Sequence, residues 1–161
     1  MISKKVINRI FNALITLFFA TPFIFLFFGQ LQQGSLGLDF ETILAENPGI
    51  NLLFITSFIT PFVGYYMLRL KQELDEDADA EMILMHLMIA VVSFIIMGNA
   101  TYGLFLAILT YFIFNNWKVH LKDIPQYFKI RGVHIKDFLA PLAFFTVAIL
   151  VRIMLTMVTN I

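Results

Sequence analysis

Four long stretches with almost no charge determine what this chain can fold into. They cover residues 10–28, 50–68, 82–117 and 138–159, and Arg152 is the one Asp, Glu, Lys or Arg among them. A helix needs about 20 apolar residues to cross the hydrocarbon core of a membrane, so the first, second and fourth stretches each predict one crossing. The chain is 60% apolar and 14% charged, against about 45–50% and about 25% in soluble domains. A soluble or a disordered protein is therefore excluded.

The third stretch requires a separate interpretation. As one helix it would be about 54 Å long, too long for one crossing, and it is slightly short for two full crossings. Its middle holds Gly98, Asn99, Thr101 and Gly103, which are turn-forming residues inside an apolar run. We expect a tight helical hairpin of residues 82–98 and 102–117, whose short spans are accommodated by local thinning of the bilayer. A re-entrant loop is the alternative.

The distribution of Lys and Arg predicts the orientation, because cytoplasmic loops carry an excess of both. Five spans place ten of the eleven basic residues on the inner side, whereas four spans would place the five-base segment before residue 138 outside. We therefore expect one domain over residues 1–161, an all-α integral membrane protein with five transmembrane helices. Its N-terminus is cytoplasmic and its C-terminus is outside, in a bacterial plasma membrane.

The first stretch also resembles a secretory signal peptide, since Lys4, Lys5 and Arg9 precede it. Its apolar run is 19 residues long, whereas a signal peptide has about 7–15, and no small-residue cleavage site follows. We interpret it as an uncleaved signal anchor.

The loop of residues 29–49 is acidic and is expected outside. Asp39 is positioned as the N-cap of a short helix that ends near Glu46 and lies on the membrane surface. Asn47 and Pro48 have the types typical of the N-cap and first position of the second span. The loop is interpreted as a lid that connects the first two spans, with a recognition surface as the alternative. The apolar side of the short helix would consist of Phe40, Ile43 and Leu44.

The segment of residues 73–81 holds six acids in nine positions. A calcium-binding EF-hand is excluded, because Ala80 replaces the required glycine and His86 the required glutamate. The segment is interpreted as a solvated helix extension whose acids lie at the N-terminus of the third span, where they favour the helix dipole. The alternatives are weak binding of a divalent ion and docking to a basic cytoplasmic partner, for which the candidates are Asp75, Glu76, Asp77 and Asp79.

The segment of residues 118–137 is basic and holds aromatic residues beside Trp117, a pattern typical of contact with anionic lipid headgroups. Pro125 and Gly132 delimit a short interfacial helix at residues 125–131. The acidic and basic inner segments are also candidates for pairing with each other. The candidate headgroup contacts are Lys118, Lys122, Lys129, Arg131 and Lys136.

Ionisable residues within membrane spans are candidates for function. Arg152 is interpreted as reaching the outer headgroups or forming an ion pair, and the alternative is binding of an anionic ligand. His86 is interpreted as an interfacial histidine bonded to a neighbour, and the alternative is a proton relay. Ser57 and Thr60 in the second span are expected to hold helices together or to allow a kink. The candidate partners of Arg152 are Asp39, Glu41 and Glu46.

Catalytic motifs are missing from the sequence. It contains no cysteine, no His-Glu-x-x-His, no phosphate-binding loop and no Gly-x-Ser-x-Gly. We therefore expect no enzyme, cofactor or metal, and a net charge of zero excludes nucleic acid as a general partner. The leading hypothesis is a non-catalytic accessory or regulatory subunit of a membrane complex, with lipid and either a membrane protein or a second copy as partners. The alternatives are a small oligomeric carrier or channel and an immunity or lipid-interacting protein.

Overall fold

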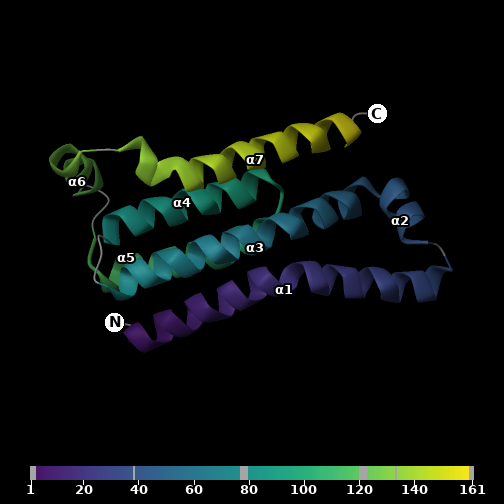
Figure 1. The fold of residues 1–161 in the computed structure, drawn as a ribbon, viewed down its shortest axis with the longest axis horizontal. Coiled ribbons are helices and arrows are strands. Elements are labelled where there is room, and N and C mark those ends of the chain that lie inside the picture. The colour runs from purple at the N-terminus through teal and green to yellow at the C-terminus, as the bar shows by residue number, and fades with distance from the viewer. Residues whose placement is uncertain (1–2, 38, 77–79, 120–122, 133, 160–161) are drawn as a thin grey trace.

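The computed structural model describes residues 3–37, 39–76, 80–119, 123–132 and 134–159, and these residues form helices and connecting turns without a strand (Figure 1). The all-helical class expected from the sequence is thereby confirmed. The helices in this part of the chain are α1 (Lys4–Leu36), α2 (Phe40–Glu46), α3 (Pro48–Asp75), α4 (Ala80–Ile96), α5 (Ala100–Asn116), α6 (Asp123–Arg131) and α7 (Ile135–Thr159).

Three of these helices are long and apolar enough to cross a membrane. The apolar segments are Lys4–Leu31 in α1, Pro48–Asp75 in α3 and Lys136–Met157 in α7. Helices α4 and α5 are apolar but have 17 residues each, which is about 25 Å of helix. The chain is thus a helical protein with three candidate membrane spans and a shorter helical pair.

The long helices lie side by side, roughly parallel to the long axis of the molecule (Figure 1). Helix α1 packs against α3, and α4 packs against both α5 and α7. Helix α5 also contacts α1 and so joins the two groups of helices. The N-terminus and α6 lie at one end of this axis, and α2 and the C-terminus lie at the other. Helices α1 and α3 extend well beyond the α4–α5 pair toward the α2 end.

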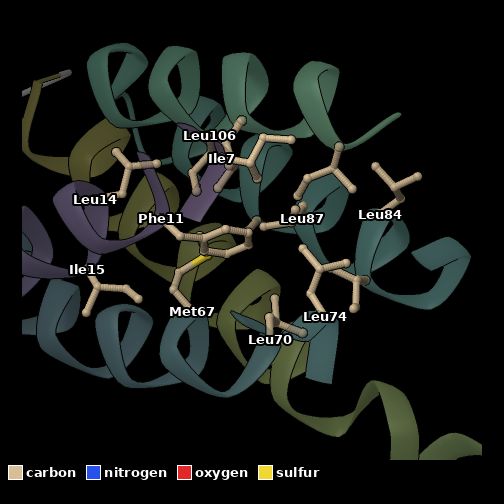
Figure 2. Close-up of a cluster of buried hydrophobic side chains, with 14 of the residues drawn as sticks. Ile7, Phe11, Leu14, Ile15, Met67, Leu70, Leu74, Leu84, Leu87 and Leu106 are labelled. Carbon is tan, nitrogen blue, oxygen red and sulfur yellow. The ribbon is translucent and has the colours of Figure 1, made fainter. Parts of the chain in front are cut away.

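The main core lies where α1, α3, α4 and α5 meet (Figure 2). Ile7, Phe11 and Leu14 recur every three or four residues, so they face one side of α1, and each is buried. Met67 and Leu70 meet them from α3. Closer to the middle of α1, Phe18 stacks on Phe94 with 5.6 Å between ring centroids.

The expected hairpin is present between α4 and α5. Gly98 has φ +81°, a left-handed conformation that only glycine adopts without strain, and the Asn99 side chain accepts a hydrogen bond from the Tyr102 backbone N–H. Gly103 is not part of the turn but lies inside α5. A Cβ there would be 3.1 Å from Ile95 Cγ1, so this glycine allows α4 and α5 to approach closely.

The end of α3 corrects one expectation. Glu73 and Asp75 were expected to begin the third span, but they lie in the last turns of α3. Two ion pairs one helical turn apart, from Arg69 to Glu73 and from Lys71 to Asp75, lie along this extension. Among the described acids of this segment, Glu81 is the one in the first turn of α4.

The two short helices agree with the sequence. Asp39 caps α2 by accepting a 2.7 Å hydrogen bond from the Thr42 backbone N–H. Phe40 contacts Gly29 of α1 and the ring of Phe54 of α3, so α2 connects these helices as a lid would. Helix α6 starts two residues before Pro125. Proline is tolerated in this first turn because the N–H groups there have no partner within the helix, so the missing N–H of proline costs no hydrogen bond.

Candidate binding cavity between α3, α4 and α7

A polar cavity of about 250 Å³ lies between α3, α4 and α7, at the end of the bundle where α7 begins. On α3, the spacing of three and four residues places its polar residues on one face. His86 of α4 and the first turn of α7 complete the wall. The polar lining residues are Tyr66, Arg69, Glu73, His86, Lys136 and Asp137.

The charges around this cavity balance. Arg69 Nε donates a 3.2 Å hydrogen bond to Glu73 Oε1, with the side chains 70% and 37% exposed. An ion pair this exposed contributes little to stability. The two terminal nitrogens of Arg69 have no hydrogen-bond partner among the described residues. Lys136 and Asp137 are exposed at the start of α7, so two cations and two carboxylates surround one space.

Two of the lining residues, Tyr66 and His86, have polar atoms that are buried beside the cavity. The hydroxyl of Tyr66 and both ring nitrogens of His86 are buried, and they have no hydrogen-bond partner within the described ranges. The His86 ring packs edge-on against Phe138, 5.1 Å between centroids, and lies 5.9 Å from the Tyr66 ring. A buried polar group without a partner costs about 1–3 kcal/mol. The hydrogen bond expected between His86 and a neighbour does not reach hydrogen-bond geometry in the described ranges, although the Asp137 backbone lies beside the His86 ring.

An apolar groove of about 470 Å³ continues from the polar cavity between α3 and α7. Tyr66, Arg69 and Ala140 line both spaces. From Arg69 the groove follows α3 to Ile59, ten residues or about 15 Å of helix, which is half of a roughly 30 Å hydrocarbon core. The other apolar lining residues are Phe62, Val63, Ala143, Phe144 and Val147.

The structure does not bring Arg152 to its candidate partners. Arg152 is exposed on α7, and no ion pair within 4 Å joins it to Asp39, Glu41 or Glu46, all of which the structure describes. Hydrogen bonding by Thr42, through its side chain and its backbone N–H, lowers the pKa of the Asp39 carboxyl. Asp39 thus has a structural role in α2, and Glu41 and Glu46 are exposed there.

The acidic segment makes its contacts with α1 and within α3. Asp75 accepts a 2.9 Å bond from Lys71 Nζ and a 3.1 Å bond from Asn8 Nδ2 of α1. Glu76 is the exposed C-cap residue of α3, while Asp77 and Asp79 lie outside the described residues. Partner docking by these acids stays a prediction.

Pairing of the basic segment with the acidic one stays a prediction, because residues 77–79, residue 122 and the side chain of residue 131 lie outside what the structure describes. Lys118 and Lys129 are exposed, and Arg131 is the last residue of α6. In the same helix, partial burial raises the pKa of the Tyr127 hydroxyl. Lys122 lies outside the described residues. Lys136, a candidate headgroup contact, lines the polar cavity.

The sequence interpretation missed four of the six polar lining residues. Tyr66, Arg69, Glu73 and Asp137 were not singled out, although the spacing of the first three already placed them on one helix face. What the sequence could not show is that α7 approaches this face.

No protein-family model, no curated protein and no solved structure matches this chain. Across the described ranges, no group of three or more His, Asp or Glu side chains is placed to hold a metal ion. The cavity therefore has to be interpreted from its own chemistry.

Proposed function

We propose that this protein binds a membrane lipid, with the headgroup in the polar cavity and an acyl chain in the apolar groove, and that it does so without catalysing a reaction. The observation that carries the proposal is the continuity of the two spaces through Tyr66, Arg69 and Ala140. A charged cavity that opens into a groove about one leaflet deep matches the two parts of an amphiphile. This function is the lipid-interacting alternative of the sequence analysis.

The charged residues support this assignment. The guanidinium of Arg69 presents a planar set of donors that suits the oxygens of a phosphate. Lys136 adds a second cation from α7. Both lie at one end of the groove, where a lipid phosphate would sit if the chain entered between α3 and α7.

Filling the groove tests the proposal. Ala143→Phe places a large ring among the apolar lining residues, whereas Ala13→Phe makes the same change at an exposed alanine of α1 that lines none of the described cavities. Each full-length protein is purified in mild detergent, and bound lipid is measured by native mass spectrometry. Wild type and Ala13→Phe should retain lipid, and Ala143→Phe should retain about tenfold less, a change of about 1.4 kcal/mol. Equal retention by both variants would overturn the proposal.

We further propose five crossings, with the N-terminus in the cytoplasm of a bacterial cell and the C-terminus outside its plasma membrane. The distribution of Lys and Arg supports this topology. The placement of the two termini at opposite ends of the long axis is in agreement with it (Figure 1).

The accessory or regulatory subunit is the second candidate function. Its support is the exposed aromatic surface in the second half of α1, where Phe23, Phe27 and Phe28 are 73%, 60% and 59% exposed. A membrane partner could pack there through its own aromatic side chains. The oligomeric carrier or channel and the immunity protein stay predictions.

A further inference from the structure

Resting on the proposed lipid site, we infer that its ligand is a glycerophospholipid whose headgroup carries a primary ammonium beside the phosphate. The inference concerns the polar cavity, where Arg69 and Lys136 supply positive charge and Glu73 and Asp137 supply negative charge. A ligand with both signs can use all four groups.

The phosphate end follows from the free donors. Arg69 uses Nε for Glu73, which leaves its terminal nitrogens to donate to phosphate oxygens. Lys136 lines the same cavity from the first turns of α7. Tyr66 and His86 line the same cavity, and the Tyr66 hydroxyl and both His86 nitrogens are buried without described partners.

The ammonium end follows from the two carboxylates. Glu73 and Asp137 come from different helices, α3 and α7, and both line the cavity. A lipid with a phosphate and no cation would add negative charge beside them, which is unfavourable when charges are taken out of bulk water. A zwitterionic headgroup keeps the sum of the charges at zero.

The carboxylates also distinguish between zwitterions. They accept hydrogen bonds, and a primary ammonium offers three N–H donors. A quaternary ammonium has no N–H group, so it would interact with Glu73 and Asp137 by charge alone. A primary ammonium therefore fits this cavity better.

Competition between lipids tests the inference. The full-length protein, delipidated in detergent, is mixed with equimolar phosphatidylethanolamine, phosphatidylcholine and phosphatidylglycerol of identical acyl chains, and bound species are counted by native mass spectrometry. We expect phosphatidylethanolamine to be enriched about tenfold over each competitor, which is about 1.4 kcal/mol. The double variant Glu73→Gln, Asp137→Asn should lose this enrichment. Glu41→Gln, Glu46→Gln makes the same change in net charge on α2 and should keep it.

The outcomes separate this inference from the proposed function. Equal binding of the three lipids, or a preference for phosphatidylglycerol, would overturn the headgroup inference. The proposed function would still stand in that case if Ala143→Phe abolishes the lipid binding. Binding of none of the three lipids would overturn both. If the double variant does not fold, as judged by its helical circular dichroism, the selectivity of the wild type alone decides.

Discussion

Thr60 is a residue whose single hydroxyl connects two helices. It is fully buried on α3, and its Oγ1 lies 3.0 Å from the carbonyl oxygen of Phe18 on α1 and 2.7 Å from that of Ser57. Because a hydroxyl has one proton, the two carbonyls share it. The expectation that Thr60 holds helices together is confirmed, whereas Ser57 bonds within its own helix, to Phe54.

One turn further, Gly64 sets how closely α1 and α3 approach. A Cβ on Gly64 would lie 3.2 Å from Phe18 Cβ and from the Phe19 ring, so α1 would have to move. We expect Gly64→Ala to destabilise the protein by about 1–3 kcal/mol, as overpacking does. Gly49→Ala, near the start of α3 with nothing within 4 Å of its Cβ, should have no such effect. Thermal unfolding in detergent measures both, and similar melting temperatures for the two variants would contradict this account.

At the level of elements, the α4–α5 hairpin is attached to α1 through Tyr102. The Thr21 hydroxyl donates to the Leu17 carbonyl, so Tyr102 is the donor of the 2.6 Å bond between the two hydroxyls. The Tyr102 ring also packs against Phe18 and Phe94. The hairpin is therefore fixed by one polar bond inside an aromatic cluster.

Removing this bond should loosen the attachment. Tyr102→Phe keeps the ring and loses the hydroxyl, so we expect a loss of stability between about 0.6 kcal/mol, the average for hydrogen bonds between membrane helices, and about 1.7 kcal/mol, the largest value. Tyr111→Phe makes the same change on the exposed side of α5 and should be neutral. Unfolding by a graded denaturing detergent, followed by Trp117 fluorescence, measures the difference. A stability loss as large for Tyr111→Phe would show that the bond is not responsible.

The sequence predicted elements better than it predicted the cavity. Gly98 and Asn99 identified the hairpin and Asp39 identified α2, because turns and caps depend on residues that are adjacent in the chain. Helices α1 and α3 continue beyond the spans expected from the sequence, and in α3 the charged turns after the apolar stretch carry ion pairs one helical turn apart. The cavity requires α7 to pack beside α3 and α4, and nothing in the order of residues specifies that arrangement.

At the level of the whole molecule, the proposed topology can be tested with cysteines, since the chain has none of its own. Single substitutions are Glu46→Cys on α2, Ala100→Cys at the hairpin tip, and Lys129→Cys on α6. We expect a membrane-impermeant maleimide added to intact cells to label the first two and not the third. Lysed cells provide the control, in which all exposed cysteines react.

Each position decides a different point. Labelling of Lys129→Cys in intact cells would contradict a cytoplasmic basic segment. An unlabelled Ala100→Cys would contradict full crossing by the hairpin and favour the re-entrant alternative, because Ala100 is exposed on the protein itself.

The unequal lengths of the helices have a consequence for the surrounding membrane. Helix α1, with 33 residues, is about 50 Å long, and α4 and α5, with 17 residues each, are about half of that. The α1–α3 flank is therefore taller than the α5 flank, and the extra turns of α1 outside residues 10–28 are mostly polar or charged. A bilayer adjusts to each mismatch at a small energetic cost per ångström. The polar ends of α1 then reach further into the headgroup layers than either end of α5, so the two flanks present different surfaces to the lipid headgroups.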